Sequence, residues 1–293
     1  MMGSRMKKYL ELIKIKQTIL LVFSAVSSYL ISCYAKPDAE IIIKLIGWAF
    51  LSVSGTTAMN MVLDRDLDAK MFRTMYRPIP RGDISTKDAL LFSIPVLLLG
   101  LALGFSINPI VGTSGILGFS VDIFLYTYLL KRKSVLNVIV GSFAGGFLAL
   151  GGWSAHTGSL DLEGLLFFLL ISSWSIPHIW SLSIYYKEDY LRAGVPMLPV
   201  ELDDVSASKS LTISVLVLGV VTISIMVIGL AGPISAIISI PYLCLLIWRC
   251  FVLQNSLKRS DSLIVFKLLS PYLGIFLISM ITERVIWPEV FYP

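Results

Sequence analysis

Long runs of apolar residues dominate the chain, and shorter polar stretches separate them. A helix needs roughly 20 apolar residues to cross a bilayer, so each long run predicts one transmembrane helix. The pattern predicts nine spans, at about 17–35, 40–60, 89–106, 110–130, 135–155, 163–184, 211–230, 232–252 and 263–282. We therefore expect an all-α, polytopic membrane protein in which residues 1–293 form one transmembrane domain around a central cavity.

Composition and charge add an orientation to this picture. Of the residues, 56% are hydrophobic and only 15% are charged, which excludes an ordinary soluble domain. If the N-terminus is inside, only Lys36, Lys44 and Arg284 of the 24 lysines and arginines lie outside. The positive-inside rule then places the N-terminus and the site on the cytoplasmic side of the plasma membrane. The net charge of +5 is explained by basic residues that set the orientation in the lipid bilayer. It is therefore no sign of nucleic-acid binding, and we expect no nucleic-acid partner.

Two connections on the inner side, 61–88 and 185–210, are much longer than the others and carry most of the acidic residues. Each starts with polar residues four positions apart and continues into a proline-containing loop. They follow the second and the sixth predicted spans, which suggests two related halves of four helices plus a ninth helix. Long loops in compact proteins are usually functional or disordered, so these two are the candidate site.

The first long connection carries a carboxylate pattern. Asn60, Asp64 and Asp68 are spaced i, i+4, i+8, so on an α-helix they share one face. Like charges at this spacing repel each other unless a cation compensates. Hard oxygen ligands suit Mg²⁺, which often bridges carboxylates to phosphates. The pattern predicts that these three residues bind Mg²⁺; the alternative is a solvated loop whose charges only flank a span.

Basic residues near this motif supply the complementary charge. We expect Arg73 and Arg77 to bind diphosphate oxygens through their guanidinium groups. Lys131 and Arg132 end the fourth predicted span on the same side, and they either bind the diphosphate or serve as positive-inside anchors. Lys14, ahead of the first span, has the same two interpretations.

The second long connection offers a second set of polar groups. Asp189 is predicted to hold a second Mg²⁺ or to complete the first coordination sphere, and Tyr185 to donate a hydrogen bond to a phosphate oxygen. His178 lies inside the sixth span beside Trp180, and ionisable residues in spans usually face a cavity or a partner. His178 is a candidate iron ligand, a candidate base, or a helix-packing residue. Asp122, inside the fourth span, has no role that the sequence identifies.

These residues also carry a resemblance. The stretch from Asn60 to Lys70, with Arg73-Thr74 and Arg77-Pro78-Ile79-Pro80, resembles the intramembrane aromatic prenyltransferases of the UbiA type. The branch it resembles is the protoheme IX farnesyltransferases, or haem O synthases. That branch is indicated by the stretches Tyr126-Thr127, Leu130-Lys131-Arg132, Gly152-Trp153, Pro177-His178 with Trp180, and Asp189-Tyr190 with Ala193-Gly194-Val195-Pro196-Met197-Leu198-Pro199.

The resemblance implies an activity and its partners. Asn60, Asp64, Asp68 and Asp189 are expected to hold farnesyl diphosphate through Mg²⁺ in a cavity among nine helices. Haem b is expected to be the acceptor, in contact with His178 and Trp180, giving haem O and pyrophosphate after water adds. An association with haem A synthase is a further expectation.

Two departures from the family pattern bear on the acceptor. The family usually has Pro-Pro where this chain has Leu148-Ala149, and Pro and Phe where it has Ile176 and Ile179. Another membrane acceptor, such as a quinone precursor or a glycerol-phosphate lipid, is therefore an alternative. A transporter is a second alternative from a different class, although transporters tend to bind substrates at mid-membrane rather than at one surface.

Overall fold

Helices account for every regular element in residues 2–287, the part of the chain that the computed structural model describes; side chains are described from residue 6 onward. Within that part, nine segments are long and apolar enough to cross a membrane. They are α2 (Ile15–Ser32), α3 (Ala39–Leu63), α5 (Thr86–Ile107), α6 (Pro109–Ser120) continued by η1 (Val121–Leu130), α7 (Asn137–Thr157), α8 (Leu162–Tyr185), α11 (Asp204–Val227), α12 (Pro233–Ser256) and α13 (Arg259–Ile286). The predicted all-α, polytopic fold is confirmed; residues 1 and 288–293 of the predicted domain lie outside the described residues.

Several helices extend beyond the apolar runs that predicted them, whereas α2 and α11 end three residues before the predicted ends at 35 and 230. The seventh span was expected to begin near 211, but α11 begins at Asp204 because the Asp203 side chain accepts hydrogen bonds from the Val205 and Ser206 amides. Such a cap satisfies amide groups that the first helical turn leaves without partners. Hydropathy detects only the part of a helix that lipid or core covers, so it misses these polar turns.

The fourth span changes its hydrogen-bonding pattern halfway. It is α-helical to Ser120 and then π-helical over η1, where bonds run between residues five apart. The Thr127 hydroxyl donates to the Asp122 carbonyl (2.7 Å), and the Lys131 amide donates to the Tyr126 carbonyl (2.7 Å). The wider turn places Asp122, Tyr126, Thr127 and Lys131 on one side of the segment.

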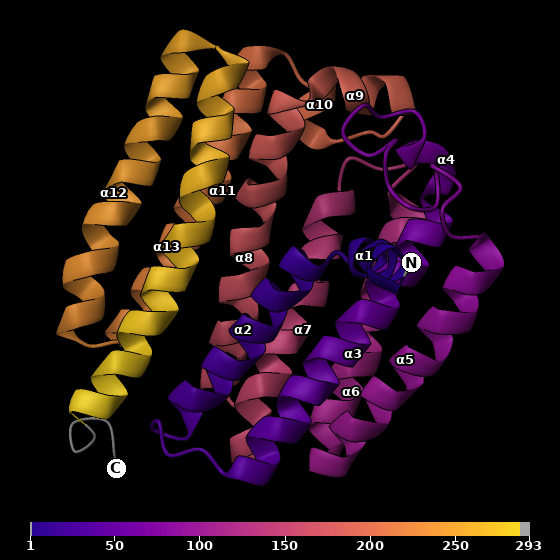
Figure 1. Cartoon of the computed structure of the whole chain (residues 1–293). Helices are drawn as coiled ribbons and strands as arrows, with labels where there is room; N and C mark the ends of the chain where they lie inside the picture. Colours follow the sequence, from indigo (N-terminus) through magenta and orange to yellow (C-terminus); the bar gives the residue numbers. More distant parts are fainter. Residues whose placement is uncertain (1, 288–293) are drawn as a thin grey trace.

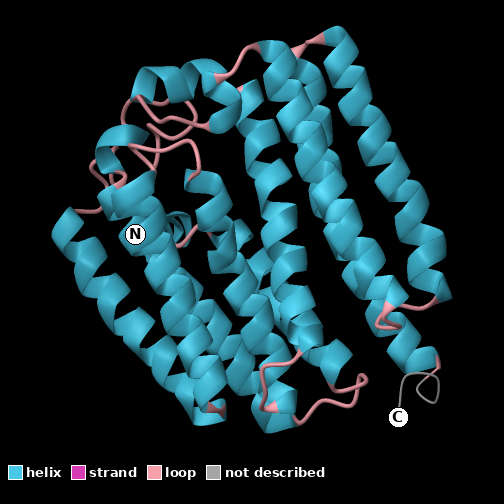
Figure 2. Ribbon diagram, turned by 180° about the vertical axis from the view of Figure 1, so that it is seen from behind, coloured by secondary structure: helices cyan, strands magenta, loops and turns pink. Residues whose placement is uncertain are grey.

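Each span packs against the next one along the chain, and α13 returns to contact α2 (Figures 1 and 2). Two further contacts, α2 with α7 and α8 with α13, connect the two sides of the bundle. The α2–α7 contact is close because Gly152 has no side chain: a Cβ there would lie 2.1 Å from the Ala25 carbonyl oxygen. A small residue thus allows close packing of α2 and α7 at this position.

The long connections gather at one end of the bundle, which we call the site end (residues 64–85 and 186–203). It holds three short helices, α4 (Arg65–Asp68), α9 (Lys187–Ala193) and α10 (Leu198–Glu201), among the loops that crowd one end of Figure 2. The helix α1 (Met2–Leu12) is seen end-on in Figure 1, lying across the bundle. It is held near this end by an ion pair between Lys8 and Asp83 (3.0 Å) and by packing of Tyr9 on Phe92.

Candidate active site

The first acidic motif occupies the end of α3 and the short helix α4. The Asp64 amide donates to the Asn60 carbonyl (2.9 Å) and the Asp68 amide to the Asp64 carbonyl (2.8 Å), so helical spacing continues through the motif. Asn60, Asp64 and Asp68 therefore lie on consecutive helical turns and share one face, as their spacing predicted. All three side chains are buried, with Asp64 only 1% exposed.

Buried carboxylates are costly unless they are paired, and each aspartate of the motif faces a cation. Nη1 of Arg77 donates to both carboxylate oxygens of Asp68 (2.7 Å each). The Thr74 hydroxyl donates to the Asp68 carbonyl (3.1 Å), which holds the loop that carries Arg77 against α4. Arg77 thus reaches the motif from within the same connection.

Lys131 reaches Asp64 from a different span. Its ammonium group forms an ion pair with Asp64 Oδ2, across a separation of 67 residues in sequence. Burial would lower the pKa of Lys131, but the neighbouring Tyr126 hydroxyl and Asp64 carboxylate outweigh it and hold that pKa above its usual range. The other oxygen, Asp64 Oδ1, is buried and has no hydrogen-bond partner.

Asn60 connects the motif to two more segments. Its Oδ1 accepts from Lys14 Nζ (3.0 Å), and its Nδ2 donates to the Thr127 hydroxyl of η1 (2.7 Å). Burial, together with the charges of Arg77 and Lys131, lowers the pKa of Lys14 to about 8. Three cations from three segments therefore face the motif: Lys14, Arg77 and Lys131.

Arg132 lies on the outer side of the motif. Its two terminal nitrogens form a bidentate pair with the exposed Asp66 (2.7 Å each), and this hydrogen-bonded pairing lowers the pKa of Asp66 to about 2. Arg132 also donates to the Leu63 carbonyl (3.1 Å) and so fixes the position of Lys131 relative to α3. In this arrangement Arg132 supports the site rather than facing Asp64 and Asp68.

The two long connections meet at Asp189. Its carboxylate accepts from the Arg73 backbone amide (3.1 Å) and forms a longer contact with Arg192 (3.5 Å). The Arg73 guanidinium lies over the Tyr186 ring (5.7 Å) and reaches the Tyr190 hydroxyl (3.5 Å). The second motif is therefore held against the first loop, as expected for two halves that face each other.

The other predicted site residues, Tyr185, His178 and Trp180, lie on α8 and, in the described part of the chain, make no hydrogen bond or ion pair with Asn60, Asp64 or Asp68. Tyr185, partly buried at the end of α8, packs edge-on against Tyr186 (4.7 Å between ring centroids). The His178 ring stacks on Trp174 (4.6 Å between ring centroids) and lies at a tilt to Phe266 (4.5 Å), and its Nδ1 is buried without a hydrogen-bond partner. Trp180 is buried, and its indole nitrogen also has no partner.

The four predicted metal ligands do not all come together. Among residues 2–287, no three His, Cys, Asp or Glu side chains are placed to share one metal ion. Asn60, Asp64 and Asp68 nevertheless fit Mg²⁺, because they are hard oxygen donors on one face and Asp64 Oδ1 is a buried carboxylate oxygen with no other partner. Asp189 belongs to the adjoining loop contact.

Some contacts were not visible in the sequence. Thr127, which holds Asn60, and Arg192, which contacts Asp189, were not identified as site residues. The Tyr126-Thr127 pair was noticed only as part of the family resemblance, and the π-helical turn that directs Thr127 to Asn60 leaves no hydropathy signal.

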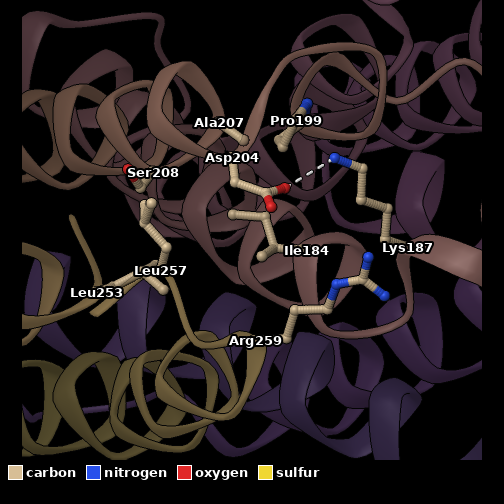
Figure 3. A pocket seen from close by; sticks show the side chains of 9 residues that line it. All are labelled: Ile184, Lys187, Pro199, Asp204, Ala207, Ser208, Leu253, Leu257 and Arg259. Atoms are coloured by element: carbon tan, nitrogen blue, oxygen red, sulfur yellow. Dashed lines mark hydrogen bonds and ion pairs between the residues drawn. The ribbon is translucent and has the colours of Figure 1, made fainter. Parts of the chain in front are cut away.

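A small pocket at the site end lies apart from these residues (Figure 3). Its lining consists of Ile184, Lys187, Pro199, Asp204, Ala207, Ser208, Leu253, Leu257 and Arg259. Lys187 pairs with Asp204 (3.0 Å), drawn as a dashed line in Figure 3, and Arg259 pairs with Glu188 (3.0 Å). No predicted site residue lines this pocket, and both of its cations already have acidic partners.

Fold and site together define a membrane protein with a charge-balanced polar cluster at one end of its helices. Residues 20–270 match the UbiA prenyltransferase family, and the chain belongs to that family. It is accordingly an enzyme of the prenyltransferase class, as the sequence motifs predicted.

Among its relatives are proteins named protoheme IX farnesyltransferase. The one from Thermofilum pendens is 42% identical, over 96% of this chain and 99% of the relative. The one from Hyperthermus butylicus is 35% identical, over 94% of this chain and 93% of the relative. The predicted resemblance to this branch is confirmed over nearly the full length of both proteins.

Solved structures share the fold. One, from work on digeranylgeranylglyceryl phosphate synthase in membranes, has a TM-score of 0.79 at 21% identity and covers 96% of this chain and 99% of its own. A UbiA homologue from Archaeoglobus fulgidus bound to GPP and Mg²⁺ has a TM-score of 0.65 at 19% identity and covers 92% of this chain and 99% of its own. At these identities the similarity concerns the arrangement of the helices.

Proposed function

We propose that this enzyme transfers a farnesyl group from farnesyl diphosphate to a vinyl group of haem b, with addition of water, giving haem O and pyrophosphate. The observation that carries the proposal is the buried pair Asp64 and Asp68 with the cations Lys131 and Arg77 facing it. Such a set of opposite charges is suited to binding a metal–diphosphate complex. The names of the relatives support haem b as the acceptor and farnesyl as the prenyl group.

In this proposal Asn60, Asp64 and Asp68 hold Mg²⁺, and Asp189 of the adjoining loop is the candidate ligand of a second ion. The ion, when bound, neutralises diphosphate charge and makes diphosphate a better leaving group. Lys14, Arg77 and Lys131 bind diphosphate oxygens and stabilise the negative charge that develops as the allylic C–O bond breaks. The centre of the Tyr126 ring lies 5.2 Å from Lys131 Nζ and so borders the same region.

His178 and Trp180 are the proposed contacts of the acceptor. His178 packs against Trp174 and Phe266, and its buried Nδ1 has no hydrogen-bond partner, so this nitrogen is the proposed contact with the acceptor. We further propose that the N-terminus and the site face the cytoplasm across the plasma membrane, and that haem A synthase takes up the product. The family departures at Leu148 and Ile179 favour one alternative, prenyl transfer to another membrane acceptor.

The test is a reconstituted reaction. Purified protein in detergent receives haem b, farnesyl diphosphate and Mg²⁺, and mass spectrometry looks for haem that has gained farnesyl plus water. EDTA and the Asp64→Asn variant should both abolish the product. Pyrophosphate release with a different acceptor, and none with haem b, would move the function to a sister branch. Near-normal activity of Asp64→Asn would show the metal assignment to be wrong.

A further inference from the structure

Asp122 is an acidic residue inside a membrane span that the proposed diphosphate site does not use. It lies in the first turn of η1 and is partly buried. Within residues 2–287 its carboxylate makes no hydrogen bond or ion pair; only its backbone carbonyl is engaged, by Thr127. Ionisable residues within spans raise the free energy of the protein in the membrane, and they usually face a polar cavity or a substrate path. Asp122 is therefore a candidate functional residue.

The side chain faces the site and not the lipid. The Thr127 hydroxyl, one π-helical turn beyond Asp122, donates to the Asp122 carbonyl and accepts from Asn60 Nδ2. Lys131, on the same side of the segment, pairs with Asp64. The residues of η1 that face outward are different ones, the exposed Phe124, Leu125, Tyr128 and Leu129. Asp122 is therefore a carboxylate near the diphosphate-binding cations that is not tied to any of them.

Its depth sets it apart from Asp64 and Asp68. Asn60 is one turn deeper in α3 than Asp64, and it contacts Thr127, five residues beyond Asp122 in the π-helix. Asp122 thus lies deeper in the membrane than the whole diphosphate motif. The apolar prenyl chain must extend in that direction from the diphosphate, and the acceptor must meet the allylic carbon there.

The chemistry requires a proton acceptor at this depth. When the allylic C–O bond breaks, its electron pair leaves with diphosphate, and the vinyl π electrons of the acceptor form the new C–C bond. The positive charge left on the acceptor is discharged when water forms a C–O bond and one water O–H bond breaks. One proton is released at this step, and a carboxylate at this depth can take it up.

We propose that the Asp122 carboxylate accepts this proton and orients the water that adds to the acceptor. The inference rests on the proposed function, because the substrate supplies the charge that must be discharged. This role also explains why Asp122 has no ion-pair partner among the described residues while Asp64 and Asp68 do. A carboxylate that acts as a base must be free to accept a proton. If Asp122 only balanced the charges of Lys14 and Lys131, its loss would instead change the affinity for the anionic diphosphate.

Two variants and two measurements separate these roles. For Asp122→Asn we expect turnover with haem b to fall at least about 100-fold, the usual contribution of general base catalysis, while the Kd for farnesyl diphosphate with Mg²⁺ stays within about threefold of wild type. Asp122→Glu keeps the carboxylate and should retain at least about a tenth of wild-type turnover. The matched control is Glu201→Gln at an exposed position, which should leave both quantities unchanged.

Each outcome decides a point. Full turnover of Asp122→Asn overturns the inference, and so does a Kd that rises as much as turnover falls. Retained diphosphate affinity shows that the variant is folded. If wild-type protein makes no haem product but releases pyrophosphate with another acceptor, the haem proposal fails by itself. The same comparison of variants with that acceptor then decides the role of Asp122.

Discussion

Arg77 illustrates how one side chain can serve two partners. Only its Nη1 atom is engaged with Asp68, which leaves further N–H donors of the guanidinium for phosphate oxygens. Arg77→Lys keeps the positive charge but not these donors. We expect the variant to hold Asp68 yet bind farnesyl diphosphate roughly tenfold more weakly, about 1.4 kcal/mol. Binding titrations measure this, with Arg65→Lys at an exposed position as the control; equal affinity would show that Arg77 acts by charge alone.

At the opposite end of the bundle, Glu283 does structural work for α12. The fully buried carboxylate accepts from the Gly232 amide (2.7 Å), the Ser235 amide (2.9 Å) and the Ser235 hydroxyl (2.7 Å), so it caps the first turn of the helix. Glu283→Gln turns one acceptor into a donor that faces N–H or O–H groups. We expect a loss of about 1–3 kcal/mol in stability, seen as a lower Tm in detergent. Farnesyl diphosphate affinity, measured on the folded protein, should not change.

At the scale of elements, close helix contacts set which spans are neighbours. Gly152→Ala places a methyl group against backbone of α2, which cannot move aside as a side chain can. The variant should push α2 from α7 and destabilise the protein by about 1–3 kcal/mol. Gly274→Ala is the control, because a Cβ there meets nothing within 4 Å. If thermal unfolding of the two variants in detergent is the same, the α2–α7 contact does not limit stability.

The elements also show what the sequence could and could not predict. Each span was recognisable from hydropathy because a helix that crosses a bilayer must be both long and apolar. The π-helical half of the fourth span was not, because η1 is as apolar as an α-helical span and its hydrogen bonds run one residue further. The shared face of Asn60, Asp64 and Asp68 followed from helical spacing alone. The contacts of these residues with Lys131 and Thr127 could not be predicted, because both partners lie 67 residues away in the sequence.

At the scale of the whole molecule, the distribution of charge predicts an orientation. The site end and the N-terminus should face the cytoplasm. In a variant without its native cysteines, Lys70→Cys at the site end should react with a membrane-impermeant thiol reagent only in inside-out vesicles. Ser159→Cys, in the connection after α7 at the other end, should react only from outside. The reverse pattern would contradict the orientation.

The ion pairs within the site have a consequence for how the enzyme binds its substrates. Lys131 and Arg77 occupy the carboxylates of Asp64 and Asp68 that a metal ion needs, and the carboxylates occupy the cations that a diphosphate needs. Neither ligand alone satisfies both sets of charges, so each should bind better when the other is present. The site then exchanges partners as a unit, and a divalent cation or a free phosphate alone meets carboxylates and cations that are already paired with each other.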